Sequence, residues 1–547
     1  MTNTSSRPGQ ELEPSRGTVP PVRASLVFLL AVALLVVFIR VRLAPVPLER
    51  DEGEYAYAAQ LWLQGVPPFV EVYTMKMPGI YAAYAVVLAL FGQSPAGIHL
   101  GLMLVNAGCT ALVYVAARRV ANVQISLQAA AIYAFLSVGV GVNGIFAHAT
   151  HFVVLFALMG LSLLPGPAED IRLVRLFASG LSFGCAFMMK QHGAPYLVFA
   201  GAYLLGFWWF KPEIARFKRA TGMALFSGGV FLPFLVMCFV VWRAGVFDTF
   251  WFWTFDYARA YIGQTTAGEI PGALMRGLKE VAWGTSLLWL LALAGLAAAA
   301  REKGGGHAVI ALFAAALVAV SPGFYFRGHY FILMLPVIAL LSAQGADFVV
   351  RAAPETWRSI LVPVVVGAGI LQGVLMQADF FFFLSPIEVS RRIYGANPFP
   401  ESIEIARYLK ERTHPEDRIG ILGSEPQICF YSSRRSATPF AYMYPLTEDH
   451  PFAADMQAEL IRDFETRRPV FIVYVPIPLS WGWMATSDRT LAEWIPKFLS
   501  EHYEQVGLIE ISSRETQYSW HDAQTRRHPR STNVVYVLKR KDFEVRA

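Results

Sequence analysis

Two adjacent carboxylates, Asp51 and Glu52, follow the first apolar stretch of the chain and are the residues best suited to acid–base chemistry. They belong to the segment LERDEGEYAYAAQLWLQGVPP, in which Asp51 can cap a helix and Glu54 completes a capping-box-like pair. Capping favours the ionised carboxylate, which is the form that a general base needs. An N-cap aspartate also has a purely structural use. Carboxylates at the edge of a hydrocarbon layer, however, are costly unless they are paired or used.

The helix that carries this pair is predicted to be amphipathic and to lie along a membrane surface. Tyr55, Ala58 and Trp62 fall on one of its faces. Gly65 and Pro67 end it.

The composition is that of a membrane protein. Of the 547 residues, 55% are hydrophobic and only 16% are charged, against about 25% charged in a soluble chain. The apolar residues form blocks, each near the length that crosses a hydrocarbon layer of about 30 Å. The net charge of +6 does not indicate nucleic acid, because the basic residues lie mostly in loops beside apolar spans. The four cysteines are too scattered for a disulfide framework or a zinc site.

Loop charges predict the topology, because Lys and Arg accumulate on the cytoplasmic side. If the N-terminus is inside and the stretch 78–93 does not cross, the main basic loops after the first span all fall inside. We therefore expect about eleven spans, an N-terminus inside and a C-terminus outside. Three arginines lie just outside the first span, on the side where the rule predicts few basic residues, and their position needs another explanation. They are Arg40, Arg42 and Arg50. The apolar stretches are 24–43, 78–93, 97–117, 124–142, 152–165, 172–189, 195–210, 220–243, 281–300, 307–323, 331–350 and 359–379.

This topology divides the chain into three parts. Residues 1–23, rich in Ser, Pro and Gly, are predicted to be a disordered cytoplasmic N-terminus. Residues 24–385 form a polytopic all-α membrane domain with interfacial helices. Residues 397–547 alternate helical patterns with short β-runs, RIGILGS, PVFIVYV and NVVYVLKRK, and predict an extracytoplasmic α/β domain.

The external loops concentrate titratable and aromatic residues on one membrane face, as a site built from several spans would need. These loops are about 44–96, 143–151, 190–193, 244–280 and 321–330.

Four segments in a fixed order resemble the membrane-embedded type C glycosyltransferases, in the branch of the protein O-mannosyltransferases and the lipid A aminoarabinose transferases. They are RDEGEYAYAAQ, YTMKMPGIYAAY, GLSFGCAFMMKQHG and FRGHYFILMLPVIALL, and with the first span they cover roughly residues 25–350. The order and spacing of the segments are specific, whereas no single segment is. One departure is Met77, which separates Lys76 from Pro78, whereas many relatives have Lys directly before Pro.

The resemblance implies transfer of a sugar from a polyprenyl-phosphate carrier to an acceptor on the outer face of a bacterial cytoplasmic (inner) membrane, with inversion. Asp51 would take the proton of the acceptor hydroxyl, and Glu52 would orient the acceptor or share that task. Cations should face the phosphate of the leaving group. The expected substrate-binding residues are Lys76, Lys190, His192, Arg259, Arg327, His329 and Tyr330. Snorkelling of their side chains is an equally good explanation for Lys190 and Arg259.

No metal ligands are assigned and no cofactor is firmly predicted, although a divalent metal is left open. His148 and His151 are spaced as a pair of ligands on a helix could be, but no third ligand lies nearby in the sequence. The expected partners are the polyprenyl-phosphate sugar donor, a glycan, lipid or protein acceptor, and membrane lipids.

Two other functions remain compatible with the pattern. A transporter or flippase of lipid-linked sugars would share the spans and the interfacial cations, but it should show repeats or ionisable residues near the membrane centre, and charges within these spans are scarce. A non-enzymatic assembly factor would use the C-terminal domain and leave the outer-face cluster incidental.

Overall fold

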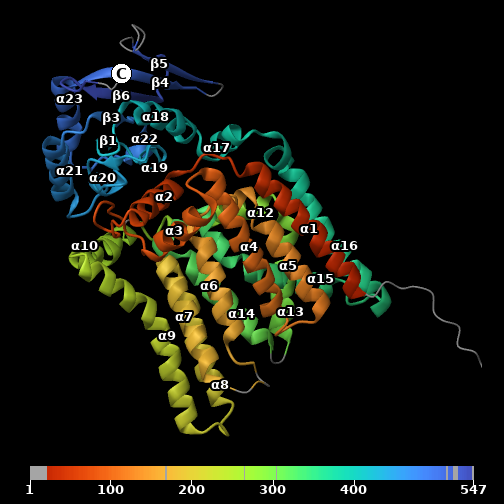
Figure 1. The fold of residues 1–547 in the computed structure, drawn as a ribbon. Coiled ribbons are helices and arrows are strands. Elements are labelled where there is room, and N and C mark those ends of the chain that lie inside the picture. Colours follow the sequence, from red (N-terminus) through yellow and green to blue (C-terminus); the bar gives the residue numbers. More distant parts are fainter. Residues whose placement is uncertain are drawn as a thin grey trace, which may run out of the picture.

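The structure is a computed structural model that describes residues 21–544, apart from 167–168, 170, 264, 303–304, 513–514 and 522–527. A long helical part carries a smaller domain with a sheet at one end (Figure 1). Residues 1–20 of the predicted disordered segment lie outside the described residues. Its last three residues are helical, because α1 begins at Pro21.

The helical part follows the predicted apolar stretches closely. Each stretch contains one main helix, although five of the stretches also reach into a second helical element, and the stretch 78–93 is a short helix, α3. The bounds are α1 (Pro21–Leu43), α2 (Arg50–Leu63), α3 (Gly79–Phe91), α4 (Pro95–Ala117), α5 (Val123–Leu136), η1 (Val140–Val142), α6 (Ala149–Leu163), α7 (Leu173–Met189), η2 (Gln191–Gly193), α8 (Ala194–Trp209), α9 (Arg216–Arg243), α13 (Ser286–Arg301), α14 (Gly305–Val320), η4 (Pro322–Phe324), η5 (Gly328–Met334), α15 (Leu335–Val349), α16 (Glu355–Met376) and η6 (Asp379–Phe383).

The segment 244–280, expected to be a long external loop, is largely helical. It contains α10 (Phe247–Trp251), a π-helical turn η3 (Phe252–Tyr257), α11 (Ala258–Ile262) and α12 (Ile270–Trp283). The loop interpretation failed because aromatic and charged residues interrupt the apolar pattern there without ending the helices.

Five described helical segments are long and apolar enough to cross a membrane: Val22–Leu43, Pro95–Ala117, Arg216–Arg243, Gly328–Val349 and Trp357–Met376. The pair α12–α13 passes the same test together but is bent by 112°. Several other apolar helices are shorter. The chain is therefore mostly helical with several apolar helices, and the expected number of eleven spans stays a prediction.

Glycines allow the helices of this part to approach closely. A Cβ atom on Gly180 of α7 would lie 2.0 Å from the Phe226 carbonyl oxygen of α9. A Cβ atom on Gly295 of α13 would lie 1.9 Å from the Leu341 carbonyl oxygen of α15. Contacts through small residues are typical of helices packed in membranes.

The C-terminal domain is built on a six-stranded sheet with the order β2-β1-β3-β6-β4-β5, in which β2, β1 and β3 are parallel and the other pairings are antiparallel. The three predicted β-runs are β1, β3 and β6, and the helical patterns predicted in ESIEIARYLKER and near residues 452–467 and 488–501 are α18, α21 and α23. The bounds are α17 (Pro386–Tyr394), α18 (Phe399–Arg412), β1 (Arg418–Leu422), α19 (Gln427–Ser432), β2 (Arg435–Ser436), α20 (Tyr444–Thr447), α21 (Ala453–Arg467), β3 (Phe471–Tyr474), α22 (Pro478–Trp481), α23 (Thr490–His502), β4 (Tyr503–Ile511), β5 (Thr516–Trp520) and β6 (Val534–Arg540).

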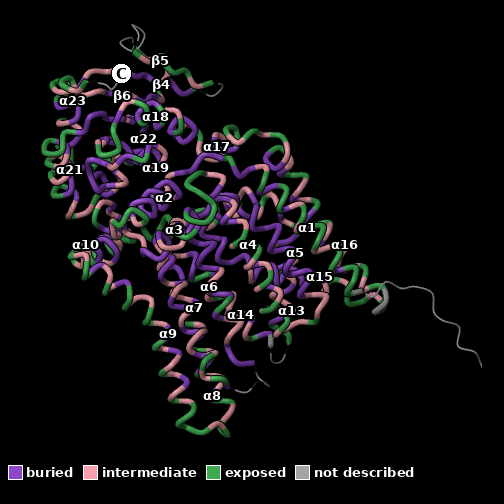
Figure 2. Tube along the Cα trace, viewed as in Figure 1, coloured by how far each residue is buried: buried purple, intermediate pink, exposed green. Residues whose placement is uncertain are grey.

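Helix α2 lies between the helical part and the C-terminal domain, and nearly all of it is buried (Figures 1 and 2). Gly53 is required at the contact, because a Cβ atom there would lie 2.7 Å from the Cβ of Gln427 in α19. The hydroxyl of Tyr57 accepts a hydrogen bond from the backbone N–H of Ser436 (2.8 Å). The domain is thus fixed to the helix that carries the candidate carboxylates.

The three arginines that violate the loop-charge rule are held inside the protein. Arg40 donates to the backbone oxygen of Ser137 (2.9 Å), and Arg42 donates to the backbone oxygen of Leu384. Arg50 forms an ion pair with the buried Glu425 (3.2 Å). Specific partners therefore explain their position after the first span.

Candidate active site

Helix α2 begins earlier than the sequence suggested. Its cap is Glu49, whose carboxylate accepts the backbone N–H of Glu52 (2.9 Å), while the Glu52 carboxylate accepts the backbone N–H of Glu49 (3.3 Å). This is a true capping box, two residues before the pair expected at Asp51 and Glu54. Asp51 is therefore in the first helical turn, and its carboxylate is released for other contacts.

Glu52, expected to act beside Asp51, is enclosed and has no exposed surface. Its second oxygen accepts the backbone N–H of Ala147 (2.6 Å) and lies 3.0 Å from the Nε2 atom of His99. These contacts connect α2 to the loop before α6 and to α4. The geometry is that of a group that holds elements in place.

Asp51 faces a small group of basic and aromatic side chains and keeps 23% of its side chain exposed. Its Oδ1 atom accepts hydrogen bonds from Lys76 Nζ (2.7 Å) and from the Tyr442 hydroxyl (3.2 Å). Burial alone would raise the pKa of Asp51, but the charge of Lys76, with His329 and His148, holds that pKa well below its usual value. Asp51 is therefore an anion throughout the neutral range.

Lys76 uses all of its donors within the protein. Besides Asp51, its Nζ atom donates to the buried carboxylate of Glu54 (2.7 Å) and to the Tyr442 hydroxyl (3.1 Å). Glu54 in turn accepts the hydroxyl of Tyr81 (2.7 Å). Despite burial, the two carboxylates raise the pKa of Lys76. This ammonium group positions Asp51, and it has no donor left for a phosphate.

Two other expected cations, Lys190 and Arg327, form no ion pair among the described residues. The Nζ atom of Lys190 lies 4.3 Å from the centre of the Tyr330 ring. The guanidinium of Arg327 is exposed and donates only a long hydrogen bond, 3.4 Å, to the Tyr261 hydroxyl. Asp51 is among the charges that act on both residues. They are the cations of the cluster that remain open to an anion.

The other expected substrate-binding residues, apart from His329, differ in where they lie relative to the cluster. His192 is buried, contacts the Tyr330 ring (4.7 Å) and has its pKa lowered well below the usual value by burial and by Lys190, so it is neutral. Tyr330 lies between His192, His329 and Lys190. Arg259 is exposed on α11 and, within the described part of the chain, is not among the contacts of the cluster.

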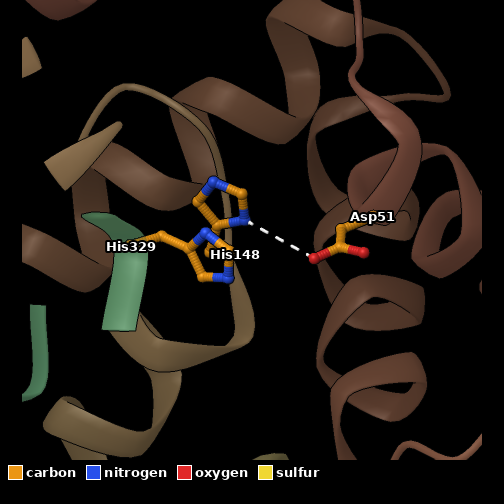
Figure 3. A group of neighbouring side chains, drawn as sticks. All are labelled: Asp51, His148 and His329. Atoms are coloured by element: carbon orange, nitrogen blue, oxygen red, sulfur yellow. Dashed lines mark ion pairs between the residues drawn. The ribbon is translucent and has the colours of Figure 1, made fainter. Parts of the chain in front are cut away.

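His148 and His329 form the wall of the cluster opposite α2 (Figure 3). Their rings stack at 4.2 Å, and His148 Nδ1 lies 4.0 Å from Asp51 Oδ2. Both ring nitrogens of His148 are buried and have no hydrogen-bond partner among the described residues. His148 is thus paired with His329, and not with His151, whose Nδ1 atom contacts Asn106 (3.2 Å).

This group could hold a divalent metal ion. One ligand atom each from Asp51, His148 and His329 lie within 4.8 Å of one another. Imidazole nitrogen with carboxylate oxygen is a donor set that Zn²⁺ accepts, at bond lengths of about 2.0–2.2 Å. Burial lowers the pKa of His148 to about 4, so its ring is in the neutral form that a metal requires.

Comparisons with known proteins agree with this architecture. Residues 75–242 match the family described as dolichyl-phosphate-mannose-protein mannosyltransferase. A crystal structure of ArnT from Cupriavidus metallidurans bound to undecaprenyl phosphate superposes with a TM-score of 0.56 at 16% identity, covering 92% of this chain and 99% of that one. The chain has the fold of the type C glycosyltransferases.

A second match to this fold is the oligosaccharyltransferase of Archaeoglobus fulgidus, solved with a tethered acceptor peptide. It superposes with a TM-score of 0.51 at 13% identity, covering 92% of this chain and 74% of that one. A structure of the same oligosaccharyltransferase contains zinc and sulfate, with a TM-score of 0.51 at 14% identity. No curated protein sequence matches the chain. The type C resemblance inferred from the four sequence segments is therefore confirmed at the level of the fold.

The sequence did not indicate two members of the cluster. Glu54 was assigned only to capping, and its pairing with Lys76 depends on how the loop 64–78 folds back. Tyr442 lies in the C-terminal domain, in the segment FAYMYPL, which carries no local signal of a site. His148 was noticed from its spacing to His151, whereas its partners come from α2 and η5.

Proposed function

We propose that this type C protein is an inverting glycosyltransferase that moves a sugar from a polyprenyl-phosphate carrier to an acceptor on the outer face of the cytoplasmic membrane. One observation carries the proposal. A carboxylate that is ionised in the neutral range, Asp51, lies in the same cluster as Lys190 and Arg327, two cations that form no ion pair with any described residue. ArnT, which has the same fold, was solved with undecaprenyl phosphate bound.

In the proposed reaction, the phosphate of the donor binds between Lys190 and Arg327. The bond between the anomeric carbon and the phosphate oxygen breaks, and these two cations stabilise the charge that develops on the phosphate. The acceptor hydroxyl attacks from the opposite side, so that the new glycosidic bond has inverted configuration. Arg327 can contact the phosphate through two N–H groups, whereas Lys190 acts as a point charge.

Asp51 orients the acceptor hydroxyl through a hydrogen bond and receives its proton. A carboxylate with a low pKa is a weak base. The attacking hydroxyl becomes strongly acidic as its oxygen bonds to the anomeric carbon, so the proton is transferred late. Lys76, Glu54 and Tyr442 hold Asp51 in place, and Glu52 fixes the helix rather than the acceptor.

We propose that this cluster, and the C-terminal domain with it, lies on the outer face, as the loop charges predict. In this arrangement the domain contributes Tyr442 to the site and helps to recognise the acceptor. The acceptor is a glycan, a lipid or a protein chain.

The first test is turnover in proteoliposomes that contain the wild-type protein, a panel of polyprenyl-phosphate sugars and a membrane extract as the source of acceptors. We expect release of polyprenyl phosphate from one donor, measured by mass spectrometry. A transporter or flippase would instead move the intact donor between leaflets, which a periodate-oxidation assay of the external leaflet detects. Translocation without release of polyprenyl phosphate would contradict the proposal.

The pH dependence of donor binding should follow the protonation of the Lys190 amine. Burial, together with the nearby positive charges of Lys76 and Arg327, lowers the pKa of Lys190 to about 7. Its ammonium form is therefore present below pH 7 and is lost as the pH rises. Because the donor phosphate binds that form, KM for the donor should rise by up to about tenfold per pH unit above pH 7.

The variant Lys190→Arg should keep its charge at every accessible pH, since arginine does not deprotonate. We expect its donor KM to be flat between pH 6 and pH 9. Lys279→Arg, an exposed position on α12, is the matched control and should keep the wild-type slope. The same slope in Lys190→Arg as in the wild type would remove Lys190 from the donor site.

A further inference from the structure

A cleft of about 380 Å³ lies outside the Asp51 cluster, between the helical part and the C-terminal domain. One wall is α10 with the start of η3, and the other is the first part of α21. Figure 1 shows α10 at the end of α9 and beside the C-terminal domain. We call this space the α10–α21 cleft. Its volume is within the range of small-ligand sites, about 300–1,000 Å³.

Aromatic rings form a large part of the wall of the α10–α21 cleft. Phe252 of η3 packs edge-to-face on Phe452, the residue before α21, with 5.0 Å between the ring centres. Tyr73, from the loop 64–78, packs on Trp253 at 5.4 Å. The rings of Phe252, Phe452 and Tyr73 are partly exposed, so a ligand in the cleft can contact them. The negative faces of aromatic rings attract organic cations.

The charged side chains of the described lining are all acidic, namely Asp248, Asp455 and Glu459. Asp248 and Asp455 are exposed and form no ion pair with any residue that the structure describes. Glu459 accepts a hydrogen bond from the Tyr73 hydroxyl, and two arginines of α21 act on its charge from outside the cleft. The combination of aromatic rings with unpaired carboxylates therefore favours a cationic group and disfavours a free phosphate.

The cleft begins at the end of a segment that can cross a membrane. Helix α9 ends at Arg243, and α10 starts after a turn of only three residues. Three apolar side chains, Leu235, Phe239 and Trp242, are exposed along the last turns of α9. Their spacing of four and three residues places them on one face of the helix. A lipid whose acyl chains lie along this face has its headgroup at the level of the cleft.

We propose that the α10–α21 cleft binds the headgroup of a phospholipid with a primary ammonium group, of the phosphatidylethanolamine class. The ammonium group has three N–H donors for carboxylates such as Asp248 and Asp455, and its charge faces the aromatic rings. A quaternary ammonium group has no N–H donor, so phosphatidylcholine fits less well. The lipid phosphate binds Arg243, which is exposed, lies five residues before Asp248 and has no ion-pair partner in the described part of the chain.

This lipid holds the C-terminal domain, which contributes Tyr442 to the Asp51 cluster, at the membrane surface. The inference does not depend on the proposed sugar transfer, because it concerns only the binding of a lipid.

The test is native mass spectrometry of the full chain released from mixed micelles with equal amounts of dioleoyl phosphatidylethanolamine, phosphatidylcholine and phosphatidylglycerol. We expect the wild type to retain one phosphatidylethanolamine in preference to the other two lipids. Asp248→Asn and Asp455→Asn each remove one carboxylate charge with little change of shape. Each should lower the occupancy of phosphatidylethanolamine about fivefold, and Arg243→Gln should lower it by a similar factor through the phosphate.

The matched control is Asp256→Asn, because Asp256 is an exposed carboxylate of η3 that does not line the cleft. This variant should retain phosphatidylethanolamine as the wild type does. Unfolding temperatures of all variants, measured in lipid nanodiscs, identify any variant that fails to fold. Asp248 and Asp455 lie on different elements, so either substitution can replace the other.

Equal retention of phosphatidylethanolamine and phosphatidylcholine by the wild type would overturn the proposal. The same loss in Asp256→Asn as in Asp455→Asn would also overturn it. A lysine side chain of another protein is the competing ligand for an acidic aromatic cleft, and Nα-acetyl-lysine methylamide is the probe for it. If this probe binds the chain in phosphatidylcholine nanodiscs, and the two lipids are retained equally, the cleft is a site for a protein amine and not for a lipid.

Discussion

Replacing Asp51 by asparagine should reduce kcat for sugar transfer by about 10²–10⁴-fold, the usual contribution of a positioned proton acceptor. Asparagine keeps the size of the side chain and can still accept the hydrogen bonds of Lys76 and Tyr442. It cannot accept the proton of the attacking hydroxyl. The effect should therefore appear in kcat, measured as polyprenyl phosphate released per enzyme, while donor binding stays within a few-fold of the wild type.

Asp256→Asn serves as the control for this variant, because Asp256 is an exposed carboxylate of η3 outside the cluster. Its kcat should equal that of the wild type. Equal turnover by Asp51→Asn and Asp256→Asn would show that Asp51 is not the proton acceptor, although the enzyme class would stand.

The second large effect concerns stability. Lys76→Met should destabilise the protein by about 3–5 kcal/mol, because it leaves the buried charge of Glu54 and the partly exposed charge of Asp51 without their shared partner. Lys76 has 15% of its side chain exposed and Glu54 has none, so water cannot replace the lost ion pair with Glu54. The measurement is equilibrium or thermal unfolding in lipid nanodiscs, compared with Lys279→Met at an exposed position.

Removing the charge of Glu54 should recover part of the lost stability. The double variant Lys76→Met with Glu54→Gln is expected to be more stable than Lys76→Met alone, since glutamine can still accept the hydroxyl of Tyr81. Wild-type stability in Lys76→Met, or no recovery in the double variant, would contradict the assignment of Lys76 as the residue that neutralises the buried Glu54.

Most helices could be predicted from the sequence because apolar blocks and their basic ends are local signals. The stretch 97–117 became α4 and the stretch 359–379 became α16. In the C-terminal domain, the β-branched runs were read correctly as β1, β3 and β6. Strands β4 and β5 were missed, because β4 follows α23 without a break and β5, TQYSW, has no apolar run.

Several residues of the site could be predicted from the sequence, but the contacts between them could not. Glu49 with Glu52 and Asp51 with Glu54 have the same spacing, and the usual preference for aspartate at the cap favoured the second pair. Groups far away in the sequence decide which of the two pairs forms the capping box, since His99 and Ala147 hold Glu52 in it. Lys76 donates all of its hydrogen bonds to protein groups, and Tyr442 reaches the cluster from the C-terminal domain. Both features likewise depend on contacts between segments far apart in the chain.

The most direct measurement of the central claim is a single-turnover reaction of the wild-type protein with membrane extract as the source of acceptor and a stoichiometric amount of polyprenyl-phosphate sugar carrying ¹³C at the anomeric position. Mass spectrometry follows polyprenyl phosphate, and NMR follows the labelled carbon. We predict that each polyprenyl phosphate released is matched by one glycosylated acceptor of inverted anomeric configuration, and that Asp51→Asn forms both products about 10²–10⁴-fold more slowly. Release of the lipid without a labelled acceptor product, or a product with retained configuration, would contradict the account.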